Sequence, residues 1–82
     1  NPFNPNTTIR YDLPEAGNVS IIIYDMMGRE VSTLTSGQKD AGYHFIQWNG
    51  TNSMGYSVAA GVYIYTIQAS QYRDLQKMIF LK

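Results

Sequence analysis

The chain has 82 residues, enough for one domain with a single modest core. It has no cysteine, so neither a disulfide framework nor a zinc-thiolate site can form. The 6 basic and 6 acidic side chains are scattered and give a net charge of zero, which argues against nucleic acid or anionic lipid as a partner.

No segment of the sequence is long and apolar enough to be an integral membrane span. The longest apolar run, residues 58–62, contains two alanines and a glycine. No secretory signal opens the chain. The first residue is Asn1 rather than Met, so we expect the sequence to be an excised or processed piece of a longer protein.

Apolar residues recur with period two, and clusters of Gly, Pro, Asn and Ser separate the runs. The first run, "TTIRYDL", places Ile9, Tyr11 and Leu13 on one face of a strand. Pro14 follows directly and ends that strand, because proline cannot donate a hydrogen bond to the ladder.

The next two runs are predicted to form a β-hairpin. "NVSIIIYD" places Val19, Ile21 and Ile23 in phase. "MMGR" then turns the chain tightly into "EVSTL", where Gly28 can supply a positive φ.

The second half of the chain continues the pattern. The polar stretch "TSGQKDAG" is predicted to be a loop, and "YHFIQWN" after it places His44, Ile46 and Trp48 on one face. A turn-rich "NGTNSMG", a short "SVAA", the strongly β-prone "GVYIYTIQA", a turn at "SQYRD" and "LQKMIFLK" complete the chain. Six or seven short strands without a helical period predict an all-β fold, a small antiparallel β-sandwich of about seven strands.

The side-chain chemistry argues against an enzyme and against a bound cofactor. The six carboxylates are dispersed, without a pair at a spacing that suggests shared acid and base work. No nucleophile has a visible base beside it. His44 is the single histidine, and its alternation with Ile46 and Trp48 is more typical of a half-buried sheet residue than of a catalyst.

Several phrases together resemble a known family over essentially the whole chain. They are the opening "NPFNP", the hairpin "YDMMGREV", the stretch "WNG...G...AAGVY" and the terminal "KMIFLK". In this order and spacing they are similar to the type A C-terminal sorting domain of the type IX secretion system. That family is similar in turn to the immunoglobulin-like domain of the flagellar hook-capping protein, so the resemblance implies an immunoglobulin-like sandwich.

The resemblance also implies a function and a set of partners. Residues 1–6 are expected to be a linker at the junction with a preceding cargo domain, and residues 7–82 the sorting domain itself. The domain is expected to direct a secreted or cell-surface cargo through the periplasm and the outer-membrane secretion machinery, after which a sortase-like protease removes it or exchanges it for an anchor. The final strand is expected to be the segment that the machinery recognises: Lys77, Met78, Ile79, Phe80, Leu81 and Lys82.

The loop "WNGTNSMG" is the best candidate for a cation site, because members of the resembling family often carry carboxylates at its first and fourth polar positions. Here those positions are Asn49 and Asn52. Neutral amides coordinate calcium only weakly, so a turn held by Asx hydrogen bonds is the favoured interpretation and no metal site is predicted.

Two interpretations are open for the large aromatic residues Trp48, Tyr63 and Tyr65. They can form an exposed platform for a sugar, or they can form the core of the sandwich. The core is favoured, because a chain with so few large apolar residues can scarcely fold without its single tryptophan.

A second function follows from the residues on the outward phase of the strands. It is an immunoglobulin-like structural or self-associating module of an extracellular or cell-surface assembly. More large apolar residues lie on outward phases than scattered exposure requires, and we expect them to form a docking face for the preceding domain or for another copy. They are Ile22, Tyr24, Tyr43, Phe45 and Ile64.

Overall fold

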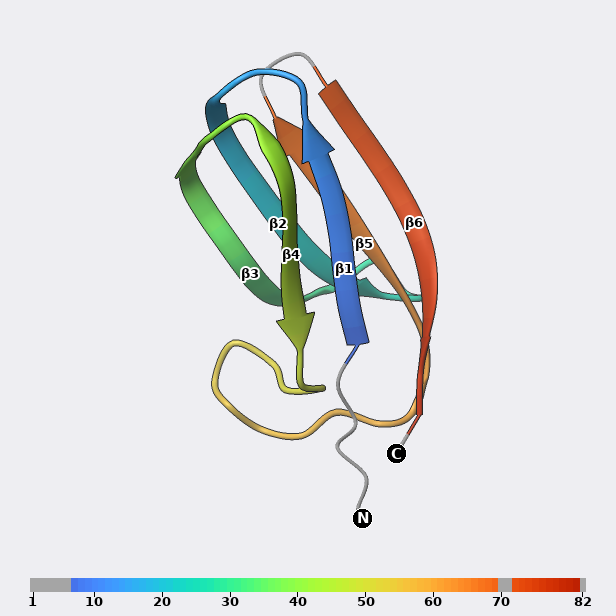
Figure 1. Ribbon diagram of the computed structural model, residues 1–82. Helices are drawn as coiled ribbons and strands as arrows, with labels where there is room; N and C mark the ends of the chain where they lie inside the picture. Colours follow the sequence, from blue (N-terminus) through green and yellow to red (C-terminus); the bar gives the residue numbers. More distant parts are fainter. Residues whose placement is uncertain (1–6, 70–71, 82) are drawn as a thin grey trace.

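The computed structural model describes residues 7–69 and 72–81. This part of the chain forms six β-strands arranged as two antiparallel sheets packed face to face (Figure 1). Sheet A has the order β1-β4, and sheet B has the order β3-β2-β5-β6. The strands are β1 (Thr7–Leu13), β2 (Gly17–Asp25), β3 (Glu30–Lys39), β4 (Gly42–Trp48), β5 (Gly61–Ala69) and β6 (Tyr72–Phe80).

The predicted fold class is confirmed, with six strands in place of about seven. The short "SVAA" is not a strand, and the only bridge there joins Thr51 to Ser57 within the described loop. The prediction of a loop at "TSGQKDAG" was wrong for most of its length. Residues 35–39 continue β3, because each pairs with a residue of β2 that supplies ladder hydrogen bonds despite the polar sequence.

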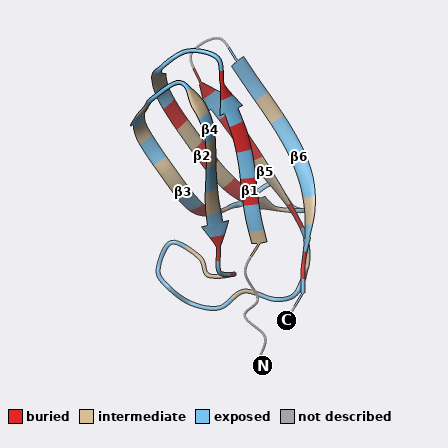
Figure 2. Ribbon diagram, in the orientation of Figure 1, coloured by how far each residue is buried: buried red, intermediate tan, exposed pale blue. Residues whose placement is uncertain are grey.

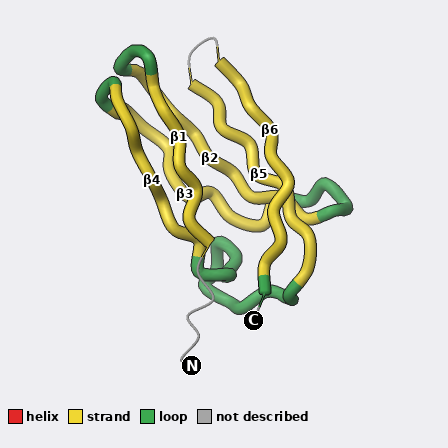
Figure 3. Tube along the Cα trace, turned by 45° about the vertical axis from the view of Figure 1, so that its right-hand side comes forward, coloured by secondary structure: helices red, strands yellow, loops and turns green. Residues whose placement is uncertain are grey.

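Two short connections carry the chain from one sheet to the other. Residues 14–16 link β1 to β2, and Asp40 with Ala41 links β3 to β4, both at the same end of the sandwich (Figure 3). β3 and β4 are edges of their sheets and are joined directly on one side. β1 and β6 are the remaining edges, on the other side.

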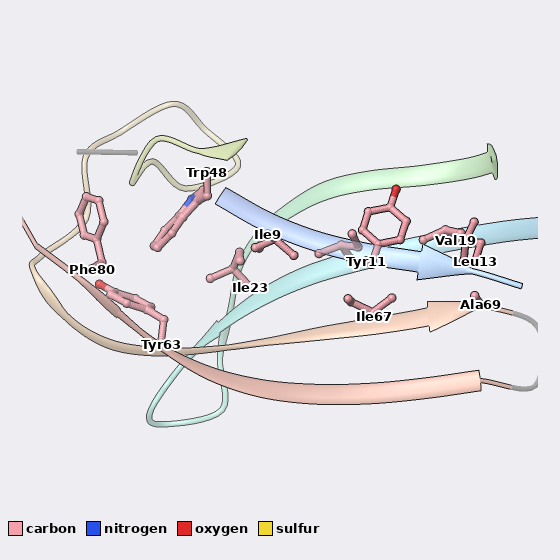
Figure 4. Close-up of a cluster of buried hydrophobic side chains, with 11 residues drawn as sticks. Ile9, Tyr11, Leu13, Val19, Ile23, Trp48, Tyr63, Ile67, Ala69 and Phe80 are labelled. Atoms are coloured by element: carbon pink, nitrogen blue, oxygen red, sulfur yellow. The ribbon is translucent and has the colours of Figure 1, made fainter. Parts of the chain in front are cut away.

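The core lies between the sheets and is made by the alternation of each strand (Figures 2 and 4). In β1 and β2 the inward positions follow the predicted period of two. At the end of the sandwich where β1 begins and β6 ends, Trp48 packs edge-on against Tyr63 and at a tilt against Phe80, with ring centroids 5.1 and 5.0 Å apart. The buried apolar residues are Ile9, Tyr11, Leu13, Val19, Ile21, Ile23, Trp48, Tyr63, Ile67, Ala69 and Phe80.

The turn between β2 and β3 has the predicted geometry. Gly28 has φ 85°, which glycine adopts without strain. The Asp25 carboxylate accepts the backbone N–H groups of Met27 and Arg29 at 2.9 and 3.0 Å and the Arg29 Nε–H at 2.9 Å. The main cause of a lowered Asp25 pKa is the hydrogen bond from the Arg29 backbone, so the charged carboxylate fixes this turn.

Candidate interaction surfaces

The loop between β4 and β5 is closed by its own asparagines. The Asn52 Oδ1 accepts the backbone N–H groups of Met54 and Tyr56 at 2.9 and 3.0 Å, and the Asn49 Oδ1 accepts the Thr51 hydroxyl at 2.7 Å. Both amide oxygens are therefore used inside the turn, and the predicted Asx hydrogen bonds are confirmed. In residues 7–69 and 72–81 no three His, Asp or Glu side chains gather where they could hold a metal ion.

The aromatic residues proposed as a sugar platform are core residues. Trp48 is 1% exposed and Tyr63 is 7% exposed, so neither can present a ring face to a ligand. The Trp48 indole N–H donates to the Thr51 carbonyl at 2.9 Å, and the Tyr63 hydroxyl donates to the Ala59 carbonyl at 2.6 Å. Tyr65 is half-buried, and burial is the main cause of its raised pKa. The core interpretation is thus confirmed.

His44 is a half-buried sheet residue, as predicted. Its ring stacks on Tyr11 with centroids 5.2 Å apart, and its Nε2 lies 2.7 Å from the Asp40 carbonyl oxygen. Burial raises the pKa of the Tyr11 hydroxyl above its usual value. Through this contact with Asp40, the stacked Tyr11 and His44 side chains hold the link between β3 and β4 against sheet A.

The five residues expected to form one docking face all point away from the core, but they lie on two different sheets. Ile22 and Tyr24 of β2 and Ile64 of β5 lie on the outer face of sheet B, where Tyr24 is directly opposite Ile64. Tyr43 and Phe45 belong to β4, on the outer face of sheet A. The core of the sandwich therefore lies between the two groups. The sequence could not show this separation, because alternation decides whether a side chain points outward but not which sheet contains its strand.

The outer face of sheet B carries a continuous apolar band. Sequence reasoning missed three of its members, although each follows the outward alternation of β5 or β6. Leu75 is 57%, Ile79 63% and Val62 38% exposed. Thr66 faces the same way yet is 8% exposed, because Ile22 and Leu75 flank it in register. The band consists of Ile22, Tyr24, Val62, Ile64, Leu75 and Ile79.

The apolar band has a charge of opposite sign at each side. One row of cross-strand neighbours runs from Glu30 on β3 through Tyr24 and Ile64 to Lys77 on β6. Side chains directly opposite in a ladder share a face. Glu30 and Lys77 therefore border the band on its two edges, and Glu30 also accepts the Thr33 hydroxyl at 3.1 Å.

The outer face of sheet A is smaller and more polar. Tyr43 is 89% and Phe45 67% exposed. They are paired across the ladder with Asp12 and Arg10, and the four residues line a shallow hollow on this face. The two remaining predicted docking residues, Tyr43 and Phe45, thus belong to a second and smaller candidate interaction surface.

The final strand combines core and surface positions. Phe80 is 2% exposed and Met78 is half-buried, whereas Ile79 is 63% and Leu81 71% exposed. Met78 and Phe80 therefore lie on the inward phase of β6 and Ile79 on the outward phase. Lys82 and the opening "NPFNP" lie outside the described residues. Because Phe80 is a core residue, removing the end of the strand would also remove part of the core.

These features define the class of the protein: an antiparallel β-sandwich module whose candidate sites are exposed strand faces. The described part of the chain contains no helix able to cross a membrane. The family model of the FlgD Ig-like domain matches residues 4–73, and the chain belongs to this family. No curated protein matches the sequence.

Two solved structures are similar over nearly the whole chain. FlgD from P. aeruginosa is 26% identical with a TM-score of 0.73, over 92% of this chain and 58% of that one. FlgD from Xanthomonas campestris, described for hook capping essential for flagellar assembly, is 25% identical with a TM-score of 0.72, over 94% and 56%. This chain thus spans little more than half the length of either relative.

These comparisons overturn the identification as a type IX sorting domain. The matching family is the FlgD Ig-like domain, so the secretion machinery and sortase-like protease as partners, and an outer-membrane destination through them, were wrong. Where the structure describes the phrases behind that resemblance, they contain fold determinants. Asp25 and Gly28 form a turn, Trp48 is core, and Gly50 lies against Phe80. These residues are explained by the β-sandwich fold and do not indicate a secretion signal.

Proposed function

We propose that this chain is a non-enzymatic structural module of an exported flagellar assembly of the hook-capping type. The observation that carries the proposal is the family match over residues 4–73, supported by the TM-score of 0.73 with FlgD over 92% of the chain. Its work is to hold neighbouring subunits in place through strand faces, and its location is outside the cytoplasm.

The residues support this role better than a catalytic one. The lowered pKa of Asp25 has a structural cause in its turn, and the raised values of Tyr11 and Tyr65 follow mainly from burial. Strongly perturbed groups at an active site usually share a cleft. Here the three lie in different strands and serve packing or a turn.

The same proposal assigns the domain organisation. Residues 7–82 form the immunoglobulin-like module, and residues 1–6 connect it to a preceding domain. The relatives support such an arrangement, since this chain covers only 58% and 56% of their lengths. The preceding domain and further copies of the module are the proposed partners.

The test is an in-frame deletion of residues 7–81 from the full-length gene in the cells that carry it. We expect the deletion strain to lack hooks by electron microscopy of sheared surface structures, and the intact gene in trans to restore them. A second strain carries the Glu15→Lys change, at an exposed position in the link between β1 and β2 outside both candidate surfaces, and should keep its hooks. Normal hooks in the deletion strain would overturn the flagellar role.

A further inference from the structure

The outer face of sheet B is an apolar sheet face that no other part of the described chain covers. It combines six apolar side chains with a glutamate on one edge and a lysine on the other. An exposed apolar patch of a few hundred Å² on a protein surface is often a contact site. Its occupant must therefore be apolar and must match this distribution of charge.

The charge distribution selects a second copy of the same face. Glu30 and Lys77 lie three strand spacings apart, about 14 Å, too far to pair within one molecule. A two-fold axis parallel to the strands, between β2 and β5, places β3 of one copy over β6 of the other. Each Glu30 then meets the Lys77 of the opposite copy, so both charges pair twice through one symmetry operation.

We propose that the outer face of sheet B forms a face-to-face homodimer in which Glu30 of each copy pairs with Lys77 of the other. This inference rests on the proposed structural function and names its self-association surface. In this arrangement Tyr24 lies over Ile64 of the other copy, and Leu75 over Thr33. An axis perpendicular to the strands would place β3 over β3 and would not form these pairs.

The size of the face sets the strength of the dimer. Four strands about 4.8 Å apart and seven residues at about 3.3 Å per residue give a face on the order of 400 Å² per copy. The two copies together would bury about 800 Å², which is below the roughly 1,200 Å² of a standard specific interface and is in the range of weak or transient contacts. We therefore expect a weak dimer in solution, with a dissociation constant between micromolar and millimolar, that becomes stable when an assembly concentrates its copies.

The first experiment is sedimentation equilibrium of the purified protein across micromolar to millimolar concentrations. We expect a monomer–dimer equilibrium that weakens with added salt, because the charge pairs lie at the rim. Leu75→Lys on the proposed face should weaken association at least tenfold. Phe45→Lys is the matched control, because it places the same charge on an exposed position of sheet A and should leave association unchanged.

Charge reversal tests the two-fold geometry. Glu30→Lys and Lys77→Glu are exposed substitutions and should keep the thermal midpoint. Each variant alone faces two like-charge contacts and should associate at least tenfold more weakly. A mixture of the two variants should form a heterodimer, since both contacts are then attractive, and the double variant should dimerise with itself. Arg10→Glu on sheet A is the charge control.

Three results would overturn the proposal. They are a wild-type protein that stays monomeric throughout the concentration range, a dimer abolished by Phe45→Lys, or a mixture of Glu30→Lys and Lys77→Glu that stays monomeric. Each is independent of hook formation. If the protein is monomeric but its deletion still removes hooks, the dimer is refuted and the structural role stands. If the protein dimerises but hooks form without it, the flagellar role is refuted and the dimer stands.

Discussion

Gly50 lies directly against the ring of Phe80. A Cβ atom on Gly50 would be 2.6 Å from Cε1 and 2.7 Å from Cε2 of that ring, inside van der Waals contact. The backbone of Gly50 also has φ 77°, and its carbonyl accepts the Val58 N–H at 2.9 Å. One small residue thus lets the loop between β4 and β5 approach the core end of the last strand.

Replacing Gly50 by Ala should therefore lower the free energy of unfolding by about 3 kcal/mol, from left-handed strain and overpacking together. The matched control is Gly55→Ala, where φ is 89° but no atom lies within 4 Å of the new Cβ. That change should cost about 1 kcal/mol. Urea unfolding measures both, and equal losses would contradict the close approach of Gly50 to Phe80.

Trp48→Ala should lower the free energy of unfolding by about 3–5 kcal/mol, because it empties the space between Tyr63 and Phe80. A domain of this size has a total stability of roughly 5 kcal/mol, so only about 0–2 kcal/mol should remain, and the thermal midpoint should fall to near room temperature in the worst case. Circular dichroism measures this. Phe45→Ala on the same strand, at 67% exposure, should leave the midpoint nearly unchanged, and a stable Trp48→Ala protein would refute the core assignment.

The Asp25 turn gives a pH dependence with a definite sign. The pKa of this carboxyl is lowered in the folded state from 3.8, so its ionised form stabilises the fold above that pH. The contribution is lost as pH falls through the lower, folded pKa. Wild-type protein should exceed Asp25→Asn in thermal midpoint at neutral pH, with the difference shrinking below about pH 4. A carboxyl titration by NMR at or above 3.8 would contradict this.

Asn52→Ala removes the acceptor of two backbone N–H groups and should cost about 1 kcal/mol of unfolding free energy. Asn52→Asp is the matched control, because its carboxylate can accept the same two bonds and should retain most of the stability. The thermal midpoint of the wild type should not change on adding calcium chloride. A calcium-dependent rise would restore the cation-site interpretation of this loop.

Much of the fold follows from local pattern alone. The alternation in β1 and β2 gave the inward residues, Pro14 marked the end of the first strand, and Gly28 marked the hairpin turn. These features depend on the period of a strand and on the conformations a single residue allows. The polar end of β3 did not follow, because its strand state comes from pairing with β2 rather than from its own residues.

The candidate surfaces were predicted in part, for a related reason. Outward phase was correct for Ile22, Ile64 and Phe45, yet the first two and the third lie on opposite faces of the sandwich. Strand order decides which outward residues become neighbours, and a single sequence does not encode that order in any local pattern. For the same reason Leu75 was not joined to Ile64 until the pairing of β5 with β6 was known.

The topology also orders the events of folding. β2 pairs with β3, and β5 with β6, and in each pair the two strands follow one another in the sequence, whereas β1 pairs with β4, which lies beyond both β2 and β3 in the sequence. Closing that long loop costs entropy before its contacts contribute. We expect sheet A to assemble after the rate-limiting step, so that mutational φ-values at Ile9 and Ile46 are lower than those at Ile21 and Ile67. Destabilising substitutions in sheet A should then mainly increase the rate of unfolding and hardly change the rate of folding. The contacts of this two-stranded sheet would therefore determine how long the folded domain persists before it unfolds.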